Sequence, residues 1–177
     1  TPGSLMSIRY HTDRKNRNPP ECFRDLGASY VQTALAIDPQ LEINGGLKVV
    51  PDSFKRRRDD EGKYSAFHQG TVSDDAVAAW GYGPGDLVLP EMAPGDVLMW
   101  HVDTIHGSDV NRSPELDRCL FINGYVKAEN CTRGHWAWLY GKPVPLPPIE
   151  VPVYVQRADV FEDPAFHYVA DLGPMRD

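Results

Sequence analysis

Short apolar runs separated by turn-forming residues dominate this chain. The runs are rich in β-branched and aromatic residues and are bounded by Gly, Pro, Asn and Asp, which is the pattern of β-strands. The predicted strands are Ile8–His11, Ala28–Ile37, Leu47–Val50, Asp86–Leu89, Val97–His101 and Cys119–Val126. Ser73–Trp80 predicts a short helix that Ser73 or Asp74 can cap.

The turns between these runs strengthen the β assignment. Asn44-Gly45-Gly46 is a hairpin-type turn sequence, and Pro84-Gly85-Asp86 and Pro94-Gly95-Asp96 each precede a predicted strand. Several short strands with regular turns are typical of a sandwich or jelly roll. The expected fold is therefore mainly β, a jelly roll with few short helices.

The 177 residues suit one domain, but the composition changes after Lys142. Residues 143–177 begin with closely spaced prolines, which force an extended path and exclude a sheet interior. We expect a core at 1–142 with a C-terminal arm, 143–177, packed on it. His11 lies so near the start that we also expect N-terminal elements of the core to be missing from this chain.

The formal charge of −7 argues against a general nucleic-acid binder, because phosphate binding needs a basic surface. No apolar run approaches the roughly 20 residues that span a bilayer, and the start of the chain has no signal-peptide pattern. Three cysteines without metal-type spacing fit reduced thiols in the cytoplasm. These observations favour a small-molecule partner over nucleic acid or membrane, and leave the oligomeric state open.

Two imidazoles and a carboxylate form a candidate metal site. His11 and Asp13 lie two residues apart, so on a strand they point to the same face. His106 follows a different predicted strand, which can lie beside the first in a closed β-fold. Neutral imidazole and carboxylate suit Fe(II) and leave part of its coordination sphere open. A second pair, His101 and Asp103, competes for this role.

Arg118 stands at the start of the last predicted strand, directly before Cys119, where a charge is costly unless it has an anionic partner. A guanidinium matches a carboxylate with two parallel hydrogen bonds, so Arg118 is a candidate anchor for a dicarboxylate. Pairing with Asp117 or Glu115 is the structural alternative. Ser108 is a candidate helper at the same place, or a turn residue.

These motifs resemble the phytanoyl-CoA dioxygenase family of Fe(II)/2-oxoglutarate oxygenases. The resemblance runs from about residue 8 to 127. It rests on His11-Thr12-Asp13, Asn44 to Ser53, Pro94 to Trp100, His106-Gly107-Ser108, Asn111-Arg112-Ser113 and Arg118. It implies a double-stranded β-helix, His11, Asp13 and His106 as iron ligands, and Arg118, with Ser108, on the distal carboxylate of 2-oxoglutarate. It places His101 and Asp103 beside the iron ligands.

The same resemblance implies an oxygenase that uses Fe(II), 2-oxoglutarate and O2 and releases succinate and CO2. Related halogenases replace the carboxylate ligand with a small residue, so Asp13 favours hydroxylation of an unactivated C–H bond in a small organic substrate. The chain departs from the family at Asp52-Ser53-Phe54, where Gly-Ser-His is usual. A non-catalytic jelly-roll binding module and a cupin-type metalloenzyme without 2-oxoglutarate are the alternatives, and Arg118 distinguishes them.

Candidate substrate contacts are Arg14 and Arg17, whose charges near the metal can steer an anion, and Trp136, in an alternating aromatic segment with Trp138 and Tyr140. Each has a structural alternative: a solvated loop for the arginines and packing for the aromatic residues. Gln32 and Thr33 point to opposite faces of their strand, so one of them faces the interior. The sequence does not identify the substrate.

Overall fold

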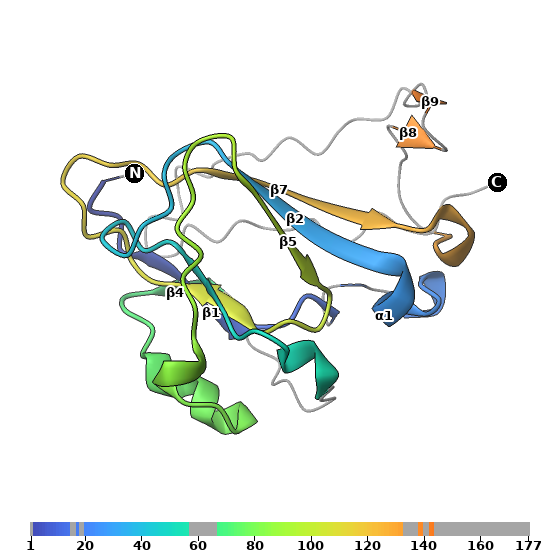
Figure 1. The fold of residues 1–177 in the computed structure, drawn as a ribbon, viewed down its shortest axis with the longest axis horizontal. Coiled ribbons are helices and arrows are strands. Elements are labelled where there is room, and N and C mark those ends of the chain that lie inside the picture. Colours follow the sequence, from blue (N-terminus) through green and yellow to red (C-terminus); the bar gives the residue numbers. More distant parts are fainter. Residues whose placement is uncertain are drawn as a thin grey trace, which may run out of the picture.

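Two antiparallel sheets form the framework of the protein (Figure 1), as seen in a computed structural model that describes residues 2–14, 17, 20–56, 67–132, 138–139 and 142–143. One sheet has the order β3-β6-β1-β4 and the other β5-β2-β7. The strands are β1 (Met6–His11), β2 (Tyr30–Ala36), β3 (Leu47–Val49), β4 (Phe67–Gln69), β5 (Val97–His101), β6 (His106–Ser108) and β7 (Leu120–Val126). A separate pair joins β8 (Trp138–Leu139) to β9 (Lys142–Pro143).

Helical segments within the described ranges are short. They are α1 (Leu26–Ser29) and the 3-10 helices η2 (Pro20–Cys22), η3 (Ser53–Lys55), η4 (Asp74–Trp80), η5 (Pro84–Asp86) and η6 (Ala128–Asn130). None of the helices in these ranges is long and apolar enough to cross a membrane. The mainly β jelly roll expected from the sequence is confirmed.

Five of the six predicted strands are present with nearly the expected bounds. The prediction for Asp86–Leu89 was wrong: Pro84 to Asp86 form η5, and Val88 makes only an isolated bridge to Val49. The Asp86 carboxylate accepts the Gly83 N–H at 2.8 Å and so holds a turn there. Ala28 and Ser29, expected in a strand, belong to α1.

The helix predicted at Ser73–Trp80 exists as η4, and Ser73 is its N-cap: its hydroxyl accepts the Asp75 N–H at 3.2 Å. Four strands were not predicted: β4, β6, β8 and β9. Each has only two or three residues, which is too short for an alternating pattern to stand out.

The turn at Asn44-Gly45-Gly46 forms, but it does not close a hairpin as expected. The flanking strands lie in different sheets, since β2 pairs with β5 and β7 whereas β3 pairs with β6. The Asn44 amide donates to the carbonyls of Pro39, at 2.7 Å, and Asp117, at 2.9 Å. The turn is therefore tied to the segment before β7 and carries the chain from one sheet to the other.

A β-bulge in β1 sets the register that matters most for the site. Ile8 lies opposite Ser108 and His11 lies opposite His106, so the pairing of β1 with β6 shifts by one residue between these two points. A bulge re-aims the side chains that follow it. Here it brings the two histidines directly across from each other.

Apolar packing lies on both sides of the β3-β6-β1-β4 sheet. Between the two sheets a small cluster joins Ala34, Leu47 and Trp100. A larger cluster lies on the side covered by η4 and contains Tyr10, Val50, Val77, Trp80 and Ile105. The space between the sheets is thus only partly filled by apolar side chains.

A hydrogen-bond network links η4 to this sheet. The Tyr10 hydroxyl donates to Asp74 at 2.6 Å, and Lys48 Nζ donates to the same carboxylate at 2.9 Å. Burial raises the pKa of Asp74, but these two donors outweigh burial and hold it below its ordinary value. Burial and the Asp74 hydrogen bond raise the pKa of Tyr10, so its hydroxyl stays a donor.

The β5-β2-β7 sheet turns an apolar face outward. Val97 and Met99 of β5 and Phe121 and Tyr125 of β7 are each more than half exposed. Their cross-strand partners on β2 are Leu35, Thr33 and Val31, so these side chains share one face. Contiguous apolar surfaces of this kind commonly mark contact surfaces.

Gly107 gives a test of the β1–β6 pairing. A Cβ at this position would lie 2.8 Å from Tyr10 Cδ1 and 2.9 Å from the Ile8 carbonyl oxygen, so β6 would have to shift. We expect Gly107→Ala to destabilise the fold by about 1–3 kcal/mol, as overpacking does. Gly85→Ala is the matched control, since a Cβ there meets nothing within 4 Å. Chemical denaturation of both variants decides; equal stabilities would contradict the tight pairing.

Candidate metal centre

Three buried side chains meet between the sheets. One ligand atom from each of His11, Asp13 and His106 lies within 4.8 Å of the other two. His11 ends β1, Asp13 follows it two residues later, and His106 begins β6. Their exposed fractions are 6%, 7% and 5%. The three residues that the sequence selected are therefore brought together.

The backbone orients both imidazoles. His11 Nδ1 lies 2.7 Å from the Arg9 carbonyl oxygen, and His106 Nδ1 lies 2.9 Å from that of Thr104. A carbonyl only accepts, so each Nδ1 must carry the proton, which leaves the Nε2 lone pair for another partner. Metal-binding histidines are commonly fixed in this way.

Asp13 reaches the site from beyond the end of β1. Its backbone N–H donates to the Val102 carbonyl at 3.0 Å, so the chain after β1 continues alongside the end of β5. Its Oδ2 lies 3.6 Å from His106 Nε2 and accepts the Trp100 indole N–H at 3.1 Å. The carboxylate is thereby held beside the His106 imidazole.

This donor set fits a divalent metal ion. Two neutral imidazoles and one carboxylate, all from one side, form the arrangement that binds non-heme Fe(II) and leaves open positions opposite the protein. A buried carboxylate is costly unless a cation or hydrogen-bond donors compensate its charge. The burial of all three side chains distinguishes the cluster from the exposed acidic groups that are common on protein surfaces.

The competing pair, His101 and Asp103, is engaged elsewhere. Arg14 binds Asp103 with two parallel hydrogen bonds, 2.5 Å to Oδ1 and 2.6 Å to Oδ2. His101 Nε2 lies 2.8 Å from the Gly27 carbonyl oxygen. The pair lies beside the triad, as the family resemblance implied.

Arg118 lies just before β7, half-buried. Its Nη1 donates to the carbonyl oxygens of Gly45 and, at 2.5 Å, Asp109. Burial lowers the pKa of Arg118, and the charge of Asp109 offsets only part of that effect. Pairing with Asp117 or Glu115 is not among its hydrogen bonds in the described part of the chain.

Gly45 makes room for this guanidinium. It has φ of +70°, and a Cβ there would lie 2.5 Å from the Asp109 and Val110 carbonyl oxygens and 2.6 Å from Arg118 Nη1. The turn that carries the chain between sheets thus also forms the wall beside Arg118.

Ser108 lies two residues after His106 on β6 and is 5% exposed. Its hydroxyl is buried and has no hydrogen-bond partner within the described ranges. A buried polar atom without a partner is costly and usually indicates an absent ligand or water. Ser108 points to the same face of β6 as His106, because alternate residues of a strand share a face.

Arg17 lies near Oδ1 of Asp13, the carboxylate oxygen that Trp100 does not contact. Its Nη2 is 3.9 Å from Asp13 Oδ1 and 3.3 Å from Gln32 Oε1, and its guanidinium lies 4.6 Å from the centre of the Tyr30 ring. Gln32 is therefore the inward-facing residue of its pair, and it also accepts the Tyr30 hydroxyl at 2.5 Å. The Thr33 hydroxyl donates a hydrogen bond to the backbone carbonyl of Asn123 on β7 at 3.2 Å.

Sequence reasoning missed two residues of the site, Tyr30 and Trp100. Trp100 lies two residues after Leu98 on β5, so the strand period puts both side chains on the inward face. No sequence feature indicated the hydrogen-bond partner of Trp100. Trp136, proposed as a substrate contact, lies outside the described residues.

A sequence model of the phytanoyl-CoA dioxygenase family matches residues 2–119, more than half of the chain. The chain belongs to the phytanoyl-CoA dioxygenase family. No curated protein matches it significantly in sequence.

Solved structures similar to this family member share its fold. The non-heme monooxygenase ThoJ, as a nickel complex, has a TM-score of 0.55 at 15% identity over 84% of this chain and 52% of ThoJ. The α-ketoglutarate-dependent carbocyclase SnoK scores 0.50 at 22% identity over 69% and 44%. Apo EctD from S. alaskensis scores 0.50 at 17% identity over 73% and 42%. The chain thus spans about half the length of these proteins.

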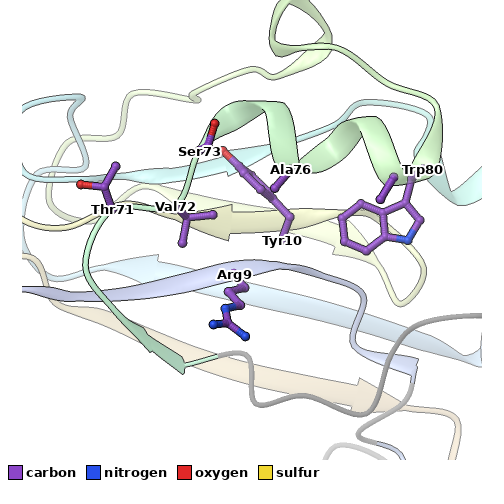
Figure 2. Close-up of a pocket in the computed structure, with 8 residues that line it drawn as sticks. Arg9, Tyr10, Thr71, Val72, Ser73, Ala76 and Trp80 are labelled. Atoms are coloured by element: carbon purple, nitrogen blue, oxygen red, sulfur yellow. The ribbon is translucent and has the colours of Figure 1, made fainter.

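A pocket of about 280 Å³ lies elsewhere on this phytanoyl-CoA dioxygenase family member, between β1 and η4 (Figure 2). Its lining includes Arg9, Thr71, Ser73 and Trp80 and none of the three clustered ligands. It is therefore separate from the candidate metal centre.

The two His-x-Asp pairs of this family member provide a matched test of the metal centre. We expect His11→Ala to weaken Co(II) binding more than about 100-fold, beyond the 10- to 100-fold cost of losing an outer partner of a ligand. His101→Ala should bind Co(II) like the unsubstituted protein, because His101 is not one of the three clustered residues and its Nε2 is engaged by the Gly27 carbonyl. Isothermal titration of both variants measures this; a larger loss in His101→Ala would assign the metal to the other pair.

Proposed function

We propose that this protein is an Fe(II)- and 2-oxoglutarate-dependent oxygenase. The observation that carries the proposal is the buried cluster of His11, Asp13 and His106, whose ligand atoms lie within 4.8 Å of one another. Family membership supports the same activity. Bound Fe(II) would supply activation of O2, coupled to oxidative decarboxylation of 2-oxoglutarate to succinate and CO2.

The three ligands would hold the ion from one side. Both imidazoles offer Nε2, because their Nδ1 atoms bond to the backbone, and Asp13 supplies a negative charge. Three protein ligands on one side would leave other positions of the ion open for the co-substrate and for O2. The three residues would therefore fix the position of the ion and leave part of its coordination sphere open.

Arg118 and Ser108 would bind the distal carboxylate of 2-oxoglutarate. Arg118 has neutral carbonyls as its hydrogen-bond acceptors, and its pKa is lowered by burial, so an anion would stabilise its charged form. Ser108 has a buried hydroxyl that needs a partner. Arg118 contacts the carbonyl of Asp109, the residue next to Ser108, so both donors belong to one end of β6.

We further propose that the reaction is hydroxylation of a C–H bond in a small organic substrate. Asp13 is intact, so no ligand position is vacated for a halide, which favours hydroxylation over halogenation. Proteins of similar fold include a monooxygenase and a carbocyclase, so the fold by itself does not select the outcome.

Arg17 is the stronger of the two arginine candidates for substrate binding. Arg14 has its charge neutralised by two hydrogen bonds to Asp103. Arg17 is 3.9 Å from Asp13 Oδ1, and its Nε is buried with no partner in the described part of the chain. We propose that it contacts an anionic group of the substrate beside the metal.

Anaerobic addition of Fe(II) and then 2-oxoglutarate should give a visible metal-to-ligand charge-transfer band. Arg118→Ala should weaken 2-oxoglutarate binding at least about 30-fold, as loss of one partner of a buried charge pair does. Arg112→Ala is the matched control, since Arg112 is exposed and pairs with the Asp109 carboxylate at 2.6 Å.

The titration separates the alternatives. Iron binding without a band would favour a cupin-type metalloenzyme that does not use 2-oxoglutarate. No iron binding would favour a non-catalytic module. An equal effect of Arg112→Ala and Arg118→Ala would contradict the role of Arg118.

Arg17 can be tested before the substrate is known. Small carboxylic acids and their matched amides would be screened for binding to the Zn(II)-loaded protein with 2-oxoglutarate present. We expect acids to bind better than amides, and Arg17→Gln to reduce that preference about tenfold, because hydrogen bonds to a charged group are strong. Competition NMR measures the affinities; an unchanged preference in Arg17→Gln would exclude the contact.

A further inference from the structure

Trp100 touches two of the three clustered ligands. Its indole N–H donates to Asp13 Oδ2 at 3.1 Å, and its ring lies 5.1 Å from the His106 ring, centre to centre. Trp100 and Asp13 are each 7% exposed. The hydrogen bond therefore lies inside the protein, where water does not compete with it.

The backbone dictates this contact. In the register of β5 with β2, Trp100 lies opposite Gln32, so it faces the space between the sheets. Asp13 is brought to the same place by its own backbone N–H, which donates to the Val102 carbonyl just after β5. Backbone hydrogen bonds thus place both residues, one on β5 and one after the end of β1, independently of the contact between their side chains.

The hydrogen bond has a consequence for the carboxylate. Rotation about the terminal bond of an aspartate side chain is loosely restricted, so an isolated carboxylate adopts many orientations. A buried indole N–H requires an acceptor, and Asp13 Oδ2 is that acceptor. Arg17 lies 3.9 Å from Oδ1, beyond hydrogen-bond distance, so it supplies charge without fixing direction.

We propose that Trp100 is a positioning residue that fixes the Asp13 carboxylate for metal binding. The proposal rests on the metal centre of the proposed function and adds a residue to it. Trp100 does not contact the ion; it acts through Asp13 and packs against His106. Its role is to hold the Asp13 carboxylate in the orientation that binds the ion and to exclude other orientations.

Trp100→Phe keeps an aromatic ring and removes the N–H. We expect this variant to bind Co(II) about tenfold more weakly than the unsubstituted protein, as other losses of an outer partner do. Trp80→Phe is the matched control: Trp80 is also 7% exposed but packs in the cluster with Val77 on the other side of the β1 sheet. Isothermal titration gives both affinities, and thermal unfolding of the metal-free variants shows whether each is folded.

A second measurement leaves Trp100 in place. The indole N–H signals of the ¹⁵N-labelled protein would be assigned with the two Phe variants. Asp13→Ala should move the Trp100 signal toward that of an unbonded indole and leave the Trp80 signal unchanged. Zn(II) should also shift the Trp100 signal in the unsubstituted protein, because its acceptor would then share charge with the ion.

The outcomes distinguish the two proposals. Equal Co(II) affinities of Trp100→Phe and Trp80→Phe, or a Trp100 signal insensitive to Asp13→Ala, overturn the positioning role while the metal centre stands. If the unsubstituted protein binds neither Co(II) nor Fe(II), the proposed function fails and the positioning role fails with it. A tenfold loss confined to Trp100→Phe, with the signal shift, supports both.

Discussion

The pairing of β1 with β6 is the constraint on which the rest of the site depends. A bulge between Ile8 and His11 shifts the register so that His11 lies opposite His106. The Tyr10 ring packs over Gly107, where a Cβ would lie 2.8 Å from Cδ1, and this close approach fixes the two strands at short range. Two candidate ligands that are remote in sequence become direct cross-strand neighbours. Asp13, two residues after the end of β1, is placed beside them by its backbone hydrogen bond to Val102.

The distribution of apolar residues leaves space for polar chemistry. The larger apolar cluster lies under η4, outside the space between the sheets, while the cluster between the sheets is small. The interior can therefore accommodate the metal ligands, Gln32 and Ser108, which would be too costly in a closely packed core. The larger apolar cluster and the candidate metal ligands therefore lie on opposite faces of one sheet.

The arginines near the site are of two kinds: one is paired with a carboxylate, and two are not hydrogen-bonded to any carboxylate in the described part of the chain. Arg14 and Asp103 neutralise each other, which fixes the segment beside the triad without adding net charge. The positive charges of Arg118 and Arg17 are less fully paired. Arg118 bonds to neutral backbone carbonyls, and the buried Nε of Arg17 has no partner in the described part of the chain. Guanidinium groups retain their charge under such conditions, so both remain suited to anions.

The sequence by itself determined the β character, the family and the candidate metal ligands, because strand period, turn residues and motif spacing are local properties. It identified His11, Asp13, His106 and Arg118, but not that Trp100 bonds to Asp13 or that Gln32 faces inward beside Arg17. It also failed at η5 and at the Asn44 turn, which joins strands of different sheets. Register, bulges and cross-sheet contacts were decided only by tertiary structure, because they depend on pairing between segments that local preferences do not connect.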